Sequence, residues 1–472
     1  MRRTVLCLRR GFLLGVLLVL LVSAAACTDD APAGQRPGDR TGEPSAGPGP
    51  VVDPAPSGEE PLVLATSVLE PPRRVDLATA RALLSGADDR WPVVAAPGLA
   101  LTGVPVARSA RRAVRRAVRR PGTVAVLRGR DLDLRLRPVV VDGVNPVRRP
   151  QDYPLTLAGE DPPPVTRLTV VGDLMLTRGV SDPAAALAPL TPRLARADLT
   201  VGTLESTLSR SGAPQQGTDS FGADPEVVAL LETAGFDALS LANNHVGDFE
   251  VPALLETVRL LRESTIVPFG AGRHLRAAGR AAVLERNGIR FGFLGFNTIG
   301  ETPRATDTAA GALSVRMPPR TGPLAEGDLR HVERQVVRLA ERVDVVVVLP
   351  HWGTQYTHRP EPIQRTVARR LARAGADLVV GGHPHWVQGL DLVGGTLVAH
   401  SLGNFVFDMD FMTQTQQGVV LEATFWGDRL TAFDLVPYRM DESFAPRVVR
   451  GDEATDILDA VRSTSTGPFR GR

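Results

Sequence analysis

The sequence predicts a layered α/β domain between about residues 165 and 445, and three observations lead to it. Beyond residue 165, short and nearly continuous apolar runs alternate with longer segments of helical periodicity. Strands that are apolar at almost every position are typical of sheets covered on both faces by helices. Polar side chains of the metal-binding type follow the ends of these runs, which is the edge where open α/β sheets carry their sites.

The first 27 residues are predicted to be a lipoprotein-type signal peptide. Several arginines precede an apolar stretch, Phe12 to Val22, that is shorter than the roughly 20 residues of a membrane-spanning helix. Small residues then lead to Cys27 in a pattern that resembles a lipobox, so we expect lipidation at Cys27 and a location on the extracytoplasmic face of the cell membrane. Ala24 stands where leucine is usual, which leaves plain secretion or a retained membrane anchor as alternatives.

The composition excludes several kinds of chemistry. The chain contains no lysine, so Schiff-base, lysine-nucleophile and P-loop mechanisms are excluded. Cleavage before Cys27 would also remove Cys7, and the mature chain would then have no disulfide, no thiolate catalyst and no four-cysteine zinc site. Net charge is +2, which by itself favours no particular partner.

Two segments precede the main domain. Residues 28–60 are rich in Pro, Gly, Ser and acidic residues and are predicted to form a disordered linker. Residues 61–160 are predicted to be a small α/β region of unclear role, with a helix near 76–85 and short strands near 124–127 and 139–141. A repeat of paired arginines at 111–120 predicts a helix with one basic half, which fits an anionic lipid or polymer, or simply a solvated helix face.

The strands and helices of the main domain follow in order. Strands are expected at 168–171, 238–241, 290–294, 343–349, 378–380 and 397–399. Helices are expected from Asp224, as N-cap before Pro225, to Gly235, at 329–341, and at 361–374 with Gly375 as a left-handed stop. Residues 419–425 and 430–436 predict an antiparallel hairpin, and residues 446–472 a frayed C-terminal tail.

Metal-binding side chains recur where these strands end. The strongest local signal is Gly-Gly-His-Pro-His, in which His383 and His385 would face the same way on an extended backbone. Imidazoles suit Zn, Mn and Fe, whereas carboxylate and amide oxygens favour harder ions such as Ca. Each residue alone has a structural alternative: Asp173 or Glu205 as a cap, His245 as a core histidine, His351 packed on Trp352. Because all of them fall at strand ends, the set favours a metal site.

The ordered series Gly-Asp-x-Met, Leu-Glu, Ala-Asn-Asn-His, His-Trp-Gly, Gly-His-Pro-His and Ser-Leu-Gly-Asn-Phe resembles the CapA family of poly-γ-glutamate (capsule) synthesis proteins. The resemblance spans about half of the chain. That family is similar to calcineurin-like metallophosphoesterases, which implies a four-layer αββα sandwich with metal at the strand ends. It also implies a catalytic role for His245, and metal ligation by Asp173, Glu205, Asn244, His351, His383 and His385. The residues expected around the ligands or at the substrate are Asn243, Trp352, Tyr356, Ser401 and Asn404.

Two departures from the family patterns bear on the metal count. Met175 replaces the histidine of the phosphoesterase Asp-x-His motif, and Gln355 replaces the usual glutamate after His-Trp-Gly. We therefore expect one tightly bound divalent ion (Mn, Zn, Fe or Ca) and a second, weaker position.

The resemblance favours a metal-dependent, phosphoesterase-like hydrolase that acts in the synthesis, export or tethering of poly-γ-glutamate or another envelope polymer. Expected partners are the anionic polymer or a phosphoester substrate, the membrane through the lipid anchor, and membrane-embedded synthase subunits. Nucleic acid is not expected, since no recognition motif accompanies the arginines. The alternatives are a non-catalytic, metal-stabilised binding or assembly protein, and a receptor that uses residues 61–160.

Overall fold

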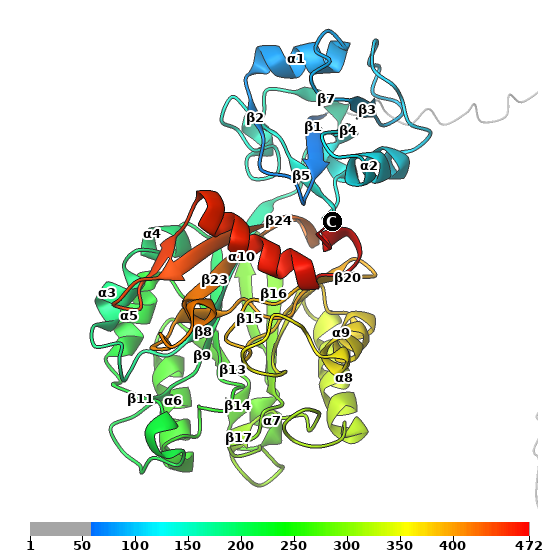
Figure 1. Cartoon of the computed structure of the whole chain (residues 1–472). Coiled ribbons are helices and arrows are strands. Elements are labelled where there is room, and N and C mark those ends of the chain that lie inside the picture. Colours follow the sequence, from blue (N-terminus) through cyan, green and yellow to red (C-terminus); the bar gives the residue numbers. More distant parts are fainter. Residues whose placement is uncertain (1–57, 472) are drawn as a thin grey trace, which may run out of the picture. The chain divides into compact units, whose positions relative to one another are not determined.

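The structure, a computed structural model, describes residues 58–471 (Figure 1). The predicted signal peptide with Cys27 and nearly all of the expected linker lie outside the described residues. Within residues 58–471, no helix is both long and apolar enough to cross a membrane. Residues 58–60, which the composition assigned to the linker, instead begin strand β1 (Gly58–Ser67), because their backbone pairs with β7 (Thr156–Gly159).

The first part of the described chain is a small sheet with two helices. Its strands run in the order β3-β4-β1-β5, with β1 antiparallel to both of its neighbours. A short parallel pair, β2 and β6, lies outside this sheet. The bounds are β2 (Arg74–Val75), α1 (Leu77–Ser85), β3 (Val93–Ala95), α2 (Ala110–Arg119), β4 (Val124–Arg128), β5 (Leu136–Pro138) and β6 (Val140–Val141).

Helix α2 confirms the helix predicted from the arginine repeat. Ser109 caps its first turn by accepting a hydrogen bond from the Arg112 N–H at 3.3 Å. Its small apolar residues, Ala113, Val114 and Ala117, are buried against the sheet, whereas its arginines are exposed. The helix is therefore docked by its apolar half, and its basic half faces solvent.

Two larger sheets follow. The first has the order β13-β12-β9-β8-β23-β24-β25, and β22 also pairs with β8. The parallel strands β13, β12, β9 and β8 precede the predicted antiparallel hairpin, β23 and β24, which is confirmed. The bounds are β8 (Val165–Leu174), β9 (Leu199–Leu204), β12 (Ala238–Ser240), β13 (Val267–Phe269), β22 (Asn404–Val406), β23 (Gln417–Trp426), β24 (Arg429–Met440) and β25 (Pro446–Val448).

The second sheet has the order β15-β16-β18-β19-β21-β20, and its four central strands are parallel. The antiparallel strands β15 and β20 form its two edges. The bounds are β15 (Ala282–Arg286), β16 (Ile289–Asn297), β18 (Val345–His351), β19 (Leu378–Val380), β20 (Leu390–Val393) and β21 (Thr396–Ala399).

Helices cover the outer face of each sheet, so the domain has the predicted four layers (Figure 1). Strand β18 shows why its residues are apolar throughout. Val345 and Val347 belong to the core between the two sheets, whereas Val346 and Val348 pack under the helices. The covering helices are α3 (Pro183–Leu187), α4 (Thr191–Leu194), α5 (Val227–Ala234) and α6 (Glu250–Glu263) on one face, and α8 (Glu326–Ala340) and α9 (Pro362–Ala374) on the other.

The predicted helices are present, but two of them start elsewhere: α8 begins at Glu326, three residues before the predicted 329, and α5 begins later than predicted. Helix α9 ends at Gly375, which has a φ of 106° as expected for a left-handed stop. Helix α5 does not begin at Asp224, because the Asp224 carboxylate accepts from the Glu226 N–H only two residues later and pairs with Arg210. This local turn delays the helix to Val227.

The expectation of a frayed C-terminal tail was wrong. Residues 446–448 add strand β25 to the first sheet, and helix α10 (Gly451–Thr464) follows. Ile457, Val461 and Phe469 are buried in the core that includes the inner faces of both sheets. These three apolar residues are separated by polar ones, so the composition of the segment wrongly predicted that it would be frayed.

Because Phe469 is only 2% exposed and packs edge-on against Phe433 at 5.5 Å, we predict that Phe469→Ala lowers the free energy of unfolding by about 3 kcal/mol. Urea denaturation measures this value. The control is Phe411→Ala, because Phe411 is 57% exposed and its loss should change stability little. Equal stabilities for the two variants would contradict the packing of the C-terminal segment.

Candidate metal centre

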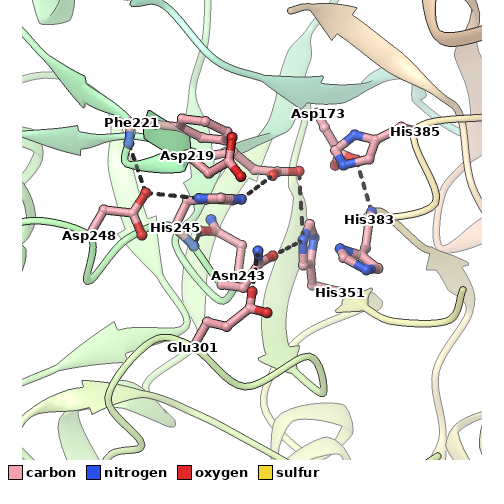
Figure 2. Close-up of polar contacts among 12 residues, drawn as sticks. Asp173, Asp219, Phe221, Asn243, His245, Asp248, Glu301, His351, His383 and His385 are labelled. Carbon is pink, nitrogen blue, oxygen red and sulfur yellow. Dashed lines mark hydrogen bonds and ion pairs between the residues drawn. The ribbon is translucent and has the colours of Figure 1, made fainter. Parts of the chain in front are cut away.

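The candidate site lies where β8, β9, β18 and β19 end. Asp173 is the second-last residue of β8, and Glu205 directly follows β9. His351 is the last residue of β18, and His383 lies three residues after β19. All four side chains are buried, and the close-up shows Asp173, His351 and His383 close to one another (Figure 2).

Asp173, Glu205 and His351 form the core of the site. One ligand atom from each lies within 4.8 Å of the others, and His351 Nε2 is 3.6 Å from Glu205 Oε1. Several of their buried atoms have no hydrogen-bond partner: Asp173 Oδ1, both carboxylate oxygens of Glu205, and His351 Nδ1. Buried polar atoms are normally satisfied, so acceptors left unpaired at one point fit a divalent cation. The donor set, two carboxylates with imidazole, could hold such an ion.

His383 and His385 lie beside this core but not in the conformation that was expected. The two residues have φ angles of 94° and 59°, so the segment is left-handed at both histidines and not extended. The His383 N–H donates to Asp173 Oδ2 at 2.8 Å, and both of its ring nitrogens are buried without a partner. The ring of His385 lies 5.8 Å from that of His383, and its Nδ1 is 2.8 Å from Asn404 Oδ1.

Gly382 makes this approach possible. A Cβ atom at this position would lie 2.3 Å from Asp173 Oδ1 and 3.2 Å from His351 Nδ1. Any side chain would therefore fill the space between two candidate ligands, which is the physical reason for glycine in the Gly-Gly-His-Pro-His segment.

Asn244 is held against His351. Its Oδ1 is 2.9 Å from His351 Nε2, and its Nδ2 donates to Glu301 Oε2 at 3.0 Å. Glu301 is itself paired with Arg320. The amide oxygen of Asn244 therefore faces the cluster, where it could serve as a further ligand.

His245 lies on the other side of Glu205, with its Nε2 3.8 Å from Glu205 Oε2. Its Nδ1 is 2.8 Å from Asp248 Oδ2, and its ring stacks on Phe221 with the centroids 3.8 Å apart. Asp248 is fixed in turn because it accepts from the Phe221 N–H at 2.8 Å and from the Gln216 side chain. Nδ1–H donates a hydrogen bond to this carboxylate, and Nε2 is the ring atom that faces the cluster (Figure 2).

The residues expected around the ligands have mixed placements. Asn404 orients His385, and the ring of Tyr356 lies 6.0 Å from that of His385. By contrast, Asn243 uses its amide within the loop, where it donates to Leu204 O and accepts from the backbone of His245 and Val246. Trp352 donates to His400 O, and Ser401 accepts from the Gly403 N–H. These last three support the backbone, and no cluster atom contacts their polar groups in the described part of the chain.

Met175, which replaces the phosphoesterase histidine, is fully buried in the apolar core beneath the helices of the first sheet. Its side chain therefore belongs to the packing and not to the cluster. Within residues 58–471, the Asp173–Glu205–His351 group is the one set of acidic and imidazole side chains with metal-binding geometry.

Burial sets the protonation of the metal-free site. It raises the pKa of Asp173 from its usual 3.8 to about 6, and burial together with the neighbouring Asp173 raises the pKa of Glu205. It lowers the pKa of His351 and His383, and takes the pKa of His385 to about 4. At neutral pH the imidazoles are thus free to act as ligands, while protons compete for the carboxylates.

Sequence reasoning did not assign roles to Asp248, Phe221, Glu301 and Arg320. Asp248 had a usable signal, since it follows His245 by three residues in a polar loop. Phe221 and Glu301 reach the site from loops distant in sequence, and nothing in their local pattern indicates it.

Comparisons with known proteins agree on one family. Residues 167–409, more than half of the chain, match the model of the family described as "Bacterial capsule synthesis protein PGA_cap". Capsule biosynthesis protein CapA of Bacillus anthracis is 29% identical over 335 residues, which cover 68% of this chain and 74% of that protein. PGA biosynthesis protein CapA of Bacillus subtilis is 29% identical over 228 residues, 48% of this chain and 57% of that protein. Among solved structures, a phosphatase from Mycoplasma pneumoniae is 12% identical, with a TM-score of 0.35 over 61% of this chain and 92% of its own.

We predict that Mn²⁺ raises the melting temperature more at about pH 7.5 than at about pH 5. The folded pKa of Asp173 is raised, so in the metal-free protein its contribution to stability is full below about 3.8 and is lost as the pH rises through about 6. Where the carboxylates are ionised, a bound cation offsets the destabilisation from their buried charge. At low pH, protons displace the cation from the carboxylates. Thermal unfolding with and without Mn²⁺ at the two pH values measures the difference.

The variant Glu205→Gln should show no Mn²⁺-dependent rise at either pH. The matched control is Glu226→Gln, because Glu226 is an exposed carboxylate paired only with Arg210. A rise of the same size in Glu205→Gln as in the parent would contradict the assignment of this cluster.

Proposed function

This chain is a member of the bacterial capsule synthesis protein PGA_cap family, and from that premise we propose that it is a metal-dependent hydrolase acting on a capsule or envelope polymer or its precursor. One observation carries the proposal. The buried Asp173–Glu205–His351 cluster, with acceptor atoms that no group in residues 58–471 satisfies, lies beside an imidazole that is positioned by its own carboxylate, Asp248. A purely structural metal site needs the cluster but has no use for the second imidazole.

Asp173, Glu205 and His351 would hold the ion, with His383, His385 and Asn244 as further ligands. A divalent ion bound there supplies Lewis acidity, which polarises the scissile group and makes water a nucleophile near neutral pH. We propose one tight position and a weaker second one, because Met175 supplies no imidazole. The metal can be Mn, Zn, Fe or Ca, since the donor set mixes carboxylate and amide oxygens with imidazole nitrogens.

His245 would act as the proton donor to the leaving group, or as a charge stabiliser. Asp248 holds Nδ1 and keeps Nε2 directed at the cluster, and Phe221 fixes the plane of the ring. A positioned general acid of this kind typically contributes about 10²–10⁴-fold to the rate. His245 is the catalytic residue in this account, and Asp248 is a positioning residue.

The substrate class comes from the relatives. Two CapA proteins whose names refer to capsule or PGA biosynthesis match this chain, and the match spans just over half of the Bacillus subtilis protein. We infer that the substrate is an amide of poly-γ-glutamate or a phosphoester of an envelope precursor. The sequence pattern around Cys27 supports lipid attachment outside the cytoplasm, where membrane-embedded synthase subunits would be partners.

The test is turnover by the metal-loaded protein on aryl phosphomonoesters, phosphodiesters and γ-glutamyl anilides. We expect His245→Asn to lower kcat by about 10²–10⁴-fold while metal content by mass spectrometry stays at the parental value. Asp248→Asn should lower kcat with little change in KM and shift the pH profile, since the ring keeps its place but loses the ionic partner. The control Asp224→Asn removes an exposed carboxylate paired with Arg210 and should have no effect.

A metal-loaded parent that turns over none of these substrates would leave the other function, a non-catalytic assembly protein whose metal holds the loops together. Loss of metal in His245→Asn would show instead that His245 is a ligand.

A further inference from the structure

A cavity of about 770 Å³ lies at one edge of the second sheet. It is lined by the last turn of α6, the short helix α7 (Leu275–Ala278) and its flanks, the edge strand β15 and the last turns of α8. None of its lining residues belongs to the Asp173–Glu205–His351 cluster. Helix α6 begins at Glu250, shortly after the His245 loop, and Arg262 lies about 18 Å further along it.

Arginine dominates the lining. The six guanidinium groups come from different elements, and they belong to Arg262, Arg273, Arg276, Arg280, Arg338 and Arg342. No acidic side chain lines the cavity. Within the described part of the chain none of the six forms an ion pair with a carboxylate, whereas arginines elsewhere, such as Arg178 and Arg370, are paired.

This crowding of like charge has an electrostatic cost. Burial, followed by the neighbouring Arg280 and Arg273, lowers the pKa of the Arg262 guanidinium. Six cationic groups around one space repel one another, and a ligand with several negative charges would relieve that repulsion. One small anion could not, because the arginines surround a volume much larger than a single oxyanion.

The floor of the cavity narrows the choice of ligand. Besides the arginines its lining is mostly aliphatic, formed by Ala277, Ala281, Val283, Leu294 and Leu339, and the other polar side chains are His274 and Gln335. A condensed phosphate has no apolar surface to place against these aliphatic side chains. Carboxylates joined by short methylene stretches match both the charged rim and the aliphatic floor.

The lining also continues into a neighbouring cavity. This cavity, of about 290 Å³, shares Arg262 and Arg273 with the first and is otherwise lined by α6, with Leu255, Val258 and the ion-paired Arg259 and Glu263. The shared arginines make the two cavities neighbours along one surface, which suits an extended chain better than a compact ligand.

We propose that this arginine cavity binds an extended polycarboxylate chain of the oligo-γ-glutamate type, separately from the metal centre. The carboxylates pair with the six arginines, and the methylene groups lie on the aliphatic floor. The choice of a glutamyl polymer rests on the proposed function, but the site itself does not depend on hydrolysis.

The experiment measures the affinity of the purified protein for a fluorescently labelled γ-linked oligoglutamate by anisotropy over a range of salt concentrations. We expect Arg273→Gln/Arg280→Gln to bind at least about tenfold more weakly, since two charge-assisted contacts are lost. The dependence of affinity on salt should also become shallower in this variant. Thermal unfolding checks that both proteins are folded.

Two controls separate this proposal from others. Arg111→Gln/Arg115→Gln removes the same charge from the exposed half of α2 and should leave the affinity unchanged. Turnover by the metal-loaded protein is measured beside the affinity, so a failed metal centre and a failed arginine cavity give different results. Unchanged binding by the cavity variant, or loss of binding by the α2 variant instead, would overturn the proposal. So would inorganic triphosphate competing more strongly than unlabelled oligoglutamate, which would assign the cavity to phosphate.

Discussion

The constraint on which the site depends is the burial of two carboxylates without a cation among the side chains around them. Asp173 and Glu205 are fully buried, and most of their oxygens have no hydrogen-bond partner in the described part of the chain. An unpaired buried charge costs several kcal/mol, so the pair is held in place by the rest of the fold and not by its own interactions. The hydrogen bond that Asp173 Oδ2 accepts from the His383 N–H fixes the loop after β19 as well as satisfying one carboxylate oxygen. A divalent cation would turn this unfavourable arrangement into a favourable one.

The fold can carry this cost because the strands that deliver the ligands are fixed on both faces. Val345 and Val347 of β18 pack between the sheets, and Val346 and Val348 pack under α8 and α9. The strand is therefore fixed on both faces, and it holds His351 at its end in place. The adjacent β19 ends in a segment where Gly382 lets the backbone approach Asp173 and His351 closely. Rigid strands and one glycine together bring groups from four separate segments to one point.

The regular parts of this arrangement could be predicted from sequence, because they follow from periodicity and from covalent order. Apolar runs predicted several strands of both sheets but not β9, and the polar residues that follow the runs made Asp173, Glu205 and His351 candidate ligands. The local backbone conformation was predicted wrongly at two places. His383 and His385 are left-handed and not extended, and Asp224 forms a turn before α5. The structure of the C-terminal segment was mispredicted for another reason. Ile457, Val461 and Phe469 are buried only because they pack into a core that strands distant in the sequence form. The partners of His245 and Asn244 were also out of reach, because Phe221 and Glu301 meet the site through tertiary contacts.

The distribution of arginine links the two proposed sites. In a chain without lysine, arginine provides every side-chain cation other than histidine, and about half of the described arginines pair with carboxylates, as Arg148 does with Glu422. The cavity arginines have no carboxylate partner in the described part of the chain, and the buried carboxylates of the metal cluster have no arginine partner there. Each site therefore lacks a counter-charge that a ligand can bring. The two do not share a residue, and the length of α6 separates their surroundings. A short oligomer can therefore occupy only one of them. A long anionic chain held in the arginine cavity would raise the effective concentration of its own distant segments at the metal centre, and that gain depends on chain length and not on any further contact.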